Sequence, residues 1–122
     1  METNRRDELA KRLLDFTVRI IKLVNALPNT VVDKHIKGQL LRSGTSPGAN
    51  YEEACGAESM NDFTHKLGIV LKELKESCFW ILVISRIEML PSKQVEPLIH
   101  ECEELCAIIA KSIVTAKAKN LK

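Results

Sequence analysis

Residues 9–28 read LAKRLLDFTVRIIKLVNALP, and this stretch decides the fold class. Its large apolar residues recur every three or four positions, so they share one narrow sector of a helix that turns by about 100° per residue. This expected core stripe consists of Leu9, Leu13, Phe16, Ile20, Val24 and Leu27. Pro28 ends the pattern, because the residue before a proline is pushed out of the helical region. We therefore expect a helix from about Asp7 to Leu27.

A second helix is expected from Thr30 to about Ala57. Thr30 and Asp33 form a variant of the capping box, in which the hydroxyl accepts a free amide and the acid favours the positive helix end. Its apolar side is expected to carry Val32, Ile36, Leu40 and Leu41. Residues 43–49, SGTSPGA, contain two glycines and a proline, which weaken helices. We favour a kinked continuous helix, whose small residues admit a neighbouring backbone, over a break into two helices.

Two longer helices should follow. Ser59 and Asp62 repeat the capping signal before a third helix from about Met60 to Leu90. Its core stripe is expected to contain Phe63, Leu67, Val70, Leu74, Cys78 and Ile81. A fourth helix is expected from about Lys93 to Ala118, with Pro97 tolerated only in its first turn. Its buried face should contain Leu98, Cys102, Leu105, Ile109, Ile113 and Ala116.

The fold class follows from these helices and from the composition. The chain has 122 residues, 45% of them hydrophobic, with only five glycines and four prolines, which are too few for a turn-rich β protein. Helices joined by short turns pack as antiparallel neighbours. We expect an all-α protein, an antiparallel four-helix bundle that forms a single domain over residues 1–122.

The same residues indicate a cytoplasmic protein that does not enter membranes. The longest apolar run, residues 78–84, is far shorter than the ~18 residues that span a bilayer. The N-terminal METNRRDE has no apolar stretch typical of a signal peptide. In a reducing compartment the four cysteines, Cys55, Cys78, Cys102 and Cys106, should not form disulfides. Cys102 and Cys106 share the apolar face of their helix, which favours buried small hydrophobes over a metal or redox role.

Two helices carry a second apolar stripe that a single bundle core does not use. On the first helix it consists of Leu14, Val18 and Ile21, and on the third of Ile69, Trp80, Val83 and Ile87. In a monomer these side chains would form an exposed apolar patch, whereas association with further copies would bury them. A wide, irregular core is the alternative. We predict a homo-oligomer, whose interface candidates are these seven residues.

No motif indicates an enzyme, a cofactor or a small-molecule substrate. Di-metal sites in helical bundles need paired Glu-x-x-His motifs, and the nearest match, Asp62 to His65, has the wrong acid and no second copy. Glu73 and Glu76 could act as an acid–base pair, but Lys72 and Lys75 flank them, which is typical of a solvated, salt-bridged face. We therefore predict no catalytic, cofactor or metal site.

Basic residues are spread along the first two helices, although the net charge is only +2. The candidates for nucleic-acid contact are Arg5, Arg12, Arg19, Lys22, Lys34, Lys37 and Arg42. The three arginines lie seven residues apart on one edge of the first helix, where they could follow a phosphate backbone. In one copy, we favour the alternative that they pair with Glu8 and Asp15 at i, i+4 spacing and only cover an exposed helix face. An oligomer would repeat this weak basic edge in every copy.

Two segments carry a family resemblance that spans nearly the whole chain. They are residues 39–54, QLLRSGTSPGANYEEA, and residues 62–80, which contain DFTHKLGI, then LKE, ES and Trp80. The chain resembles the bacterial four-helix bundle family that includes proteins encoded by intervening sequences in 23S rRNA genes. Pro47 departs from the aliphatic residue usual in that family. The resemblance implies a ring-like homopentamer without established enzymatic activity, and kinship with the basic, nucleic-acid-binding accessory protein of diversity-generating retroelements, whose net charge is higher.

The signature polar residues of these segments have two interpretations. They are Asn50, Glu53, His65, Lys66, Glu73 and Glu76. They could form a shared functional surface or fix the register of the helices, and we favour the structural role. Two functions follow for the whole protein. The first is a pentameric accessory protein that binds RNA or DNA through phosphates, and the second is a protein-interaction scaffold without a nucleic-acid role.

Overall fold

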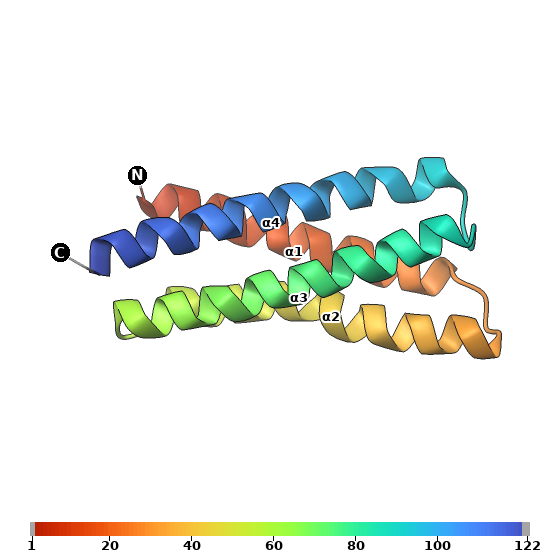
Figure 1. Cartoon of the computed structure of the whole chain (residues 1–122), viewed down its shortest axis with the longest axis horizontal. Helices are drawn as coiled ribbons and strands as arrows, with labels where there is room; N and C mark the ends of the chain where they lie inside the picture. Colours follow the sequence, from red (N-terminus) through yellow and green to blue (C-terminus); the bar gives the residue numbers. More distant parts are fainter. Residues whose placement is uncertain (1, 121–122) are drawn as a thin grey trace.

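The protein is an all-α bundle of four antiparallel helices (Figure 1). The computed structural model describes residues 2–120, with side chains for residues 5–119, and no strand occurs in that part of the chain. The helices are α1 (Glu2–Ala26), α2 (Val31–Cys55), α3 (Met60–Arg86) and α4 (Ser92–Asn120). Each packs closely against the next in sequence, whereas α1 and α4 touch over a much shorter length. Over the same residues, no helix has an apolar window long enough to cross a membrane.

Both predicted helix starts are confirmed by their hydrogen bonds. The Thr30 hydroxyl accepts from the Asp33 amide at 3.2 Å, and the Asp33 carboxylate accepts from the Thr30 amide at 3.3 Å. This reciprocal pair satisfies amides that the first turn of α2 leaves without partners. The Ser59 hydroxyl accepts from the Asp62 amide at 3.1 Å and starts α3 in the same way. The capping residues in the local sequence therefore fix where α2 and α3 begin.

Two predicted details of the later helices are wrong. Helix α3 ends at Arg86, not Leu90, because Glu88 adopts a left-handed backbone (φ 58°) and the Met89 amide turns back to the Ile84 carbonyl at 3.1 Å. Pro97 lies inside α4, beyond its first turn, since that helix already begins at Ser92. The carbonyl left without an amide partner belongs to Lys93, an exposed residue, so water can satisfy it.

The core confirms the predicted stripes of three helices and corrects that of α2. All six residues of the α1 stripe are buried, as are most of those from α3 and α4, with Phe63, Cys78 and Ile113 half-buried. Val32 and Leu41 are exposed instead (59% and 42%). The buried face of α2 consists of Asp33, Ile36, Leu40, Ser43, Gly44, Pro47, Tyr51 and Ala54. Small residues fill the middle of this face, so aliphatic periodicity alone does not reveal it.

Helix α2 is continuous through residues 43–49, and its glycines admit α1, as predicted. A β-carbon on Gly44 would lie 2.7 Å from Cγ2 of Ile20, and one on Gly48 would lie 3.2 Å from Oγ1 of Thr17 and 3.4 Å from the Leu13 carbonyl oxygen. Contacts below about 3 Å between carbons are repulsive, so only glycine fits at position 44 without a shift of Ile20. The glycines thus set the spacing between α1 and α2.

Replacing Gly44 by alanine should lower the free energy of unfolding by about 1–3 kcal/mol, because overpacking against the stiff, β-branched Ile20 outweighs the better helix propensity. Gly38 is the matched control, since it lies in the same helix with no atom within 4 Å of an added β-carbon. Gly38→Ala should stabilise the protein by up to about 1 kcal/mol. Urea unfolding followed by circular dichroism measures both, and equal effects would contradict the close approach.

Candidate nucleic-acid interface

A groove opens between α1 and α4 at the end of the bundle where α1 begins, α4 ends and α2 turns into α3 (Figure 1). Its volume is about 410 Å³. Five of its lining residues are basic, whereas Glu8 is its one acidic lining residue in the described chain. We call it the basic groove, and its basic residues are Arg5, Arg6, Arg12, Lys111 and Lys119. The groove joins one edge of α1 to the C-terminal half of α4.

Arg12 forms the inner wall of the basic groove and ties α1 to α4. Its guanidinium donates to Glu101 through Nη2 at 2.6 Å and Nε at 3.2 Å, and Nη2 lies 3.0 Å from Oε1 of Glu104. The hydrogen bond with Glu101 raises the pKa of Arg12 above its usual value, although partial burial opposes this. Two carboxylates thus neutralise Arg12. Arg5 and Lys111 also line the groove and have no ion-pair partner among the described side chains.

Apolar and aromatic side chains form the floor of the basic groove. Tyr51 is buried, with 2% of its surface exposed, and burial raises the pKa of its phenol. Phe63 is half-buried and lies under Arg6, whose guanidinium carbon is 4.6 Å from the ring centroid. Such a cation–π contact holds the guanidinium at the rim and covers the ring. The groove therefore presents charge to a ligand and offers little aromatic surface for stacking.

The structure divides the seven sequence-predicted nucleic-acid candidates. Arg5 and Arg12 line the basic groove, and Arg19 follows them on the same edge of α1. Lys37 donates to the Asn29 side chain at 2.6 Å, near the opposite end of the bundle, where Lys22 and Lys34 are also exposed. Arg42 is engaged by Glu73 and Glu76 of α3. The seven candidates therefore do not lie on one face of the bundle.

Three basic groove residues escaped the sequence analysis: Arg6, Lys111 and Lys119. Arg6 adjoins the predicted ridge in sequence, but its cation–π contact is with Phe63 of α3, a helix that only the fold brings within reach of its long side chain. Lys119 belongs to the basic last turn of α4, a signal visible in the sequence as KAKN at residues 117–120, whereas Lys111 lies about two turns earlier in the same helix. Only the fold shows that this end of α4 faces the arginine edge of α1.

The signature polar residues mainly connect α2 with α3. Lys66 lies 2.9 Å from Oε1 of Glu53 and 3.5 Å from Oδ1 of Asn50, whose amide also donates to Ser46 of the preceding turn. Glu73 and Glu76 pair with Arg42, and Glu76 also accepts from the Trp80 indole at 3.2 Å. His65 is exposed. These contacts cross between adjacent helices and are of the kind that fixes their register.

The predicted interface residues differ in exposure. Leu14, Val18 and Ile21 are exposed on α1 (61%, 41% and 41%). Trp80 and Val83 are half-buried and pack partly against the core, and Ile69 is also half-buried, whereas Ile87 is 52% exposed. Two exposed apolar residues of α3 were not among the candidates, namely Phe79 (57%) and Leu82 (44%). Phe79 packs edge-on against Trp80 with 5.0 Å between ring centroids.

The fold places the protein in the class of all-α, antiparallel four-helix bundles. Residues 6–111 match the family of the 23S rRNA-intervening sequence protein, and the chain belongs to that family. A crystal structure of a protein of unknown function from the S23 ribosomal protein family of Bacteroides thetaiotaomicron VPI-5482 is also similar. The two share 35% identity over 86% of this chain and 97% of the other, with a TM-score of 0.79. No curated protein matches the chain.

Proposed function

We propose that this protein is a homo-oligomeric, non-enzymatic accessory protein that binds RNA or DNA through phosphates, and that the basic groove is the contact surface. The main support for nucleic-acid binding is the set of cations that line this groove. Arg5 and Lys111 stand at its rim without an ion-pair partner among the described side chains. Unpaired cations around a concave surface concentrate positive potential and attract a polyanion. The family's connection with 23S rRNA genes makes RNA the first polymer to test.

The groove suits phosphate recognition better than recognition of bases. Stacking needs an open aromatic face, but Tyr51 is buried and Arg6 covers Phe63. Guanidinium groups bind phosphate oxygens through paired hydrogen bonds, and lysine supplies a compact positive charge. The expected binding is therefore strong at low salt and tolerant of sequence.

Self-association is supported by the positions of the exposed apolar stripes. Helices α1 and α3 lie on opposite corners of the bundle, because α3 packs on both α2 and α4, whereas α1 packs mainly on α2 and has no close backbone contact with α3 among the described residues. Outward-facing residues on opposite corners, such as Leu14 on α1 and Phe79 on α3, point in different directions. Two different patches on opposite corners suit a head-to-tail contact, in which the α1 patch of one copy packs on the α3 patch of the next. Such contacts form a closed ring when the rotation from copy to copy adds up to a full turn. We propose the homopentamer that the family resemblance implies.

A ring would also strengthen polyanion binding. One groove offers few cations, and single phosphate contacts are weak at physiological salt. Repetition around a ring converts several weak contacts into one intramolecular set, so the affinity rises without any new contact. The two parts of the proposal, oligomer and nucleic-acid contact, therefore reinforce each other but can be tested separately.

Replacing Arg5, Arg6 and Lys111 together by glutamine should weaken binding of a labelled single-stranded RNA by about two orders of magnitude near 0.1 M salt. Each lost phosphate contact removes about 0.7 from the slope of log K against log salt, so the slope should fall by about 2. Fluorescence anisotropy at several salt concentrations measures both quantities. The reverse change, Glu101→Gln with Glu104→Gln, frees Arg12 and should strengthen binding.

The control for this variant removes the same charge elsewhere. Lys72, Arg86 and Lys93 are exposed on α3 and at the start of α4, away from the basic groove. Their triple replacement by glutamine should lower affinity far less. Equal losses in both triple variants would show unspecific attraction to net charge. Binding that ignores salt and all of these variants would remove the nucleic-acid proposal and leave a protein-interaction scaffold.

The pair of substitutions Leu14→Glu and Val18→Glu should convert the oligomer to single chains of 13.7 kDa, because two buried carboxylates in an apolar contact cost several kcal/mol. Val114→Glu is the matched control, since Val114 is 68% exposed on α4, outside both stripes, and its variant should keep the oligomer. Light scattering coupled to gel filtration measures the mass. A wild-type mass of one chain at micromolar concentration would refute self-association.

A further inference from the structure

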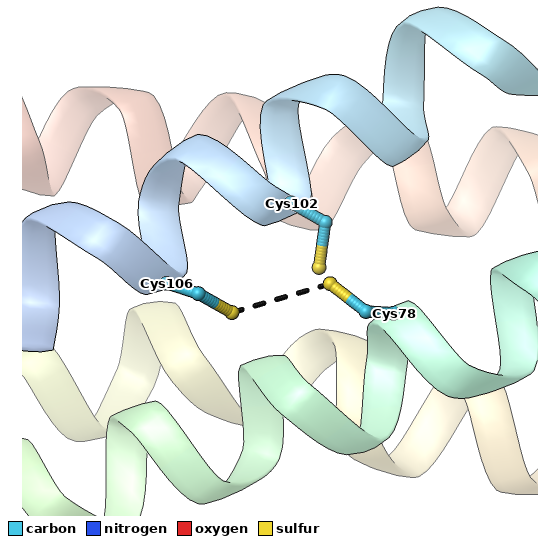
Figure 2. Close-up of side chains that lie close together, drawn as sticks. All are labelled: Cys78, Cys102 and Cys106. Carbon is cyan, nitrogen blue, oxygen red and sulfur yellow. Dashed lines mark hydrogen bonds between the residues drawn. The ribbon is translucent and has the colours of Figure 1, made fainter.

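Three thiols converge at the seam between α3 and α4, and none of them lines the basic groove. Cys78 comes from α3, and Cys102 and Cys106 come from adjacent turns of α4, with all three side chains directed toward one another (Figure 2). Every pair of the three sulfur atoms lies within 4.8 Å, and the Sγ atoms of Cys78 and Cys106 are 4.0 Å apart. All four cysteines of the protein are free thiols.

The sequence predicted only half of this arrangement. Cys102 and Cys106 are four residues apart and share a helix face, which favoured their role as small hydrophobes. The antiparallel packing of α3 on α4 adds Cys78 to the pair, although it lies far away in sequence. Cys102 is buried, whereas Cys78 and Cys106 are half-buried, so the cluster is closed toward the core and open toward the α3–α4 surface. A small ion could enter from that side.

The sulfur spacing fits a metal ion bound by three thiolates. With metal–sulfur bonds of ~2.3 Å, the sulfur atoms of a trigonal planar site are ~4.0 Å apart. The Cys78–Cys106 separation already has this value, and the other pairs need shifts of less than an ångström. The cluster contains no fourth protein ligand among the described residues, whereas structural zinc sites use four. Three thiolates alone suit a soft ion that accepts low coordination, above all Cu(I).

The three thiols of the cluster differ in pKa, because they share hydrogen bonds. Hydrogen bonding to Cys106 and to Cys78, together with burial, raises the pKa of the Cys102 thiol, and the pKa of the Cys78 thiol is raised as well. Hydrogen bonding from Cys102, and then from Cys78, lowers the pKa of the Cys106 thiol, and the positive charge of Lys75 acts in the same direction. The Cys102 thiol lies 3.2 Å from the Leu74 carbonyl oxygen, so its proton has an acceptor in the protein until a metal ion displaces it. A metal ion that binds here must therefore displace the protons of Cys78 and Cys102.

We propose that Cys78, Cys102 and Cys106 form a three-coordinate binding site for a soft, thiophilic metal ion, with Cu(I) as its preferred occupant. Binding would replace the thiol protons by one ion held between α3 and α4, and the protons would pass to the solvent. The resulting complex of one Cu(I) and three thiolates carries two negative charges, which Lys75 partly offsets. No oxidation or reduction is involved. Since the site joins two helices, occupancy should stabilise the bundle.

The test is an anaerobic titration of the reduced, full-length protein with Cu(I) in competition with a chromophoric Cu(I) chelator. One ion per chain should transfer from the chelator to the protein, and the thermal midpoint of unfolding should rise, because the ion binds only the folded arrangement. Cys78→Ser or Cys106→Ser should each weaken binding by at least about a hundredfold, the upper range seen for the loss of mere outer-shell partners. Circular dichroism confirms that the variants fold.

Cys55 supplies the matched control, because it is a half-buried cysteine on α2 outside the cluster. Cys55→Ser should bind Cu(I) as the wild-type protein does. In the wild-type protein, Cu(I) should protect three cysteines from alkylation and leave the reactivity of Cys55 unchanged, as read by peptide mass, which requires no variant to fold. Failure to compete with the chelator, equal weakening by Cys55→Ser, or unprotected thiols would each overturn the proposal. None of these outcomes bears on the basic groove.

Discussion

The close approach of α1 to α2 at Gly44 is the constraint on which the rest of the structure depends. The Ile20 side chain occupies the space where any other residue at position 44 would carry its β-carbon, and Gly48 lies similarly close to Leu13 and Thr17. This contact brings α1 onto α2 along its length and leaves it only a short contact with α4. A bundle with four equal contacts would fill the space between its first and last helices. Here that space remains a groove.

The groove owes its character to charges that meet only because of this packing. Arg12 bridges to Glu101 and Glu104 across the narrow part and thereby limits how far α1 and α4 separate. Beyond that bridge, carboxylates are scarce and the cations of both helices face the same opening. The α2–α3 side of the bundle differs, because Arg42 and Lys66 are each paired with carboxylates there. The basic residues Arg42 and Lys66 on the α2–α3 side are therefore neutralised by carboxylates, whereas Arg5 and Lys111 of the basic groove have no ion-pair partner among the described side chains.

The three surface features described above lie on different parts of the helices. The edge of α1 and the end of α4 form the basic groove, the outer faces of α1 and α3 carry the exposed apolar stripes, and the seam of α3 with α4 holds the three thiols. The three surfaces are built from different residues. Membership of the 23S rRNA-intervening sequence protein family agrees with the whole arrangement of helices, since the match covers all four.

The sequence by itself determined the four helices, both capped helix starts, the glycine contact and most of the core, because each rests on local chemistry or on a repeat of three to four residues. It failed at Val32 and Leu41, because the buried face of α2 is made of small residues and Tyr51, which periodicity of large aliphatic residues does not mark. Only the tertiary structure decided which cations form ion pairs, that Lys111 lines the same groove as Arg5, and that Cys78 joins Cys102 and Cys106. These are contacts between distant segments, whose partners are set by the relative rotation and register of whole helices, and no short-range pattern encodes those two quantities.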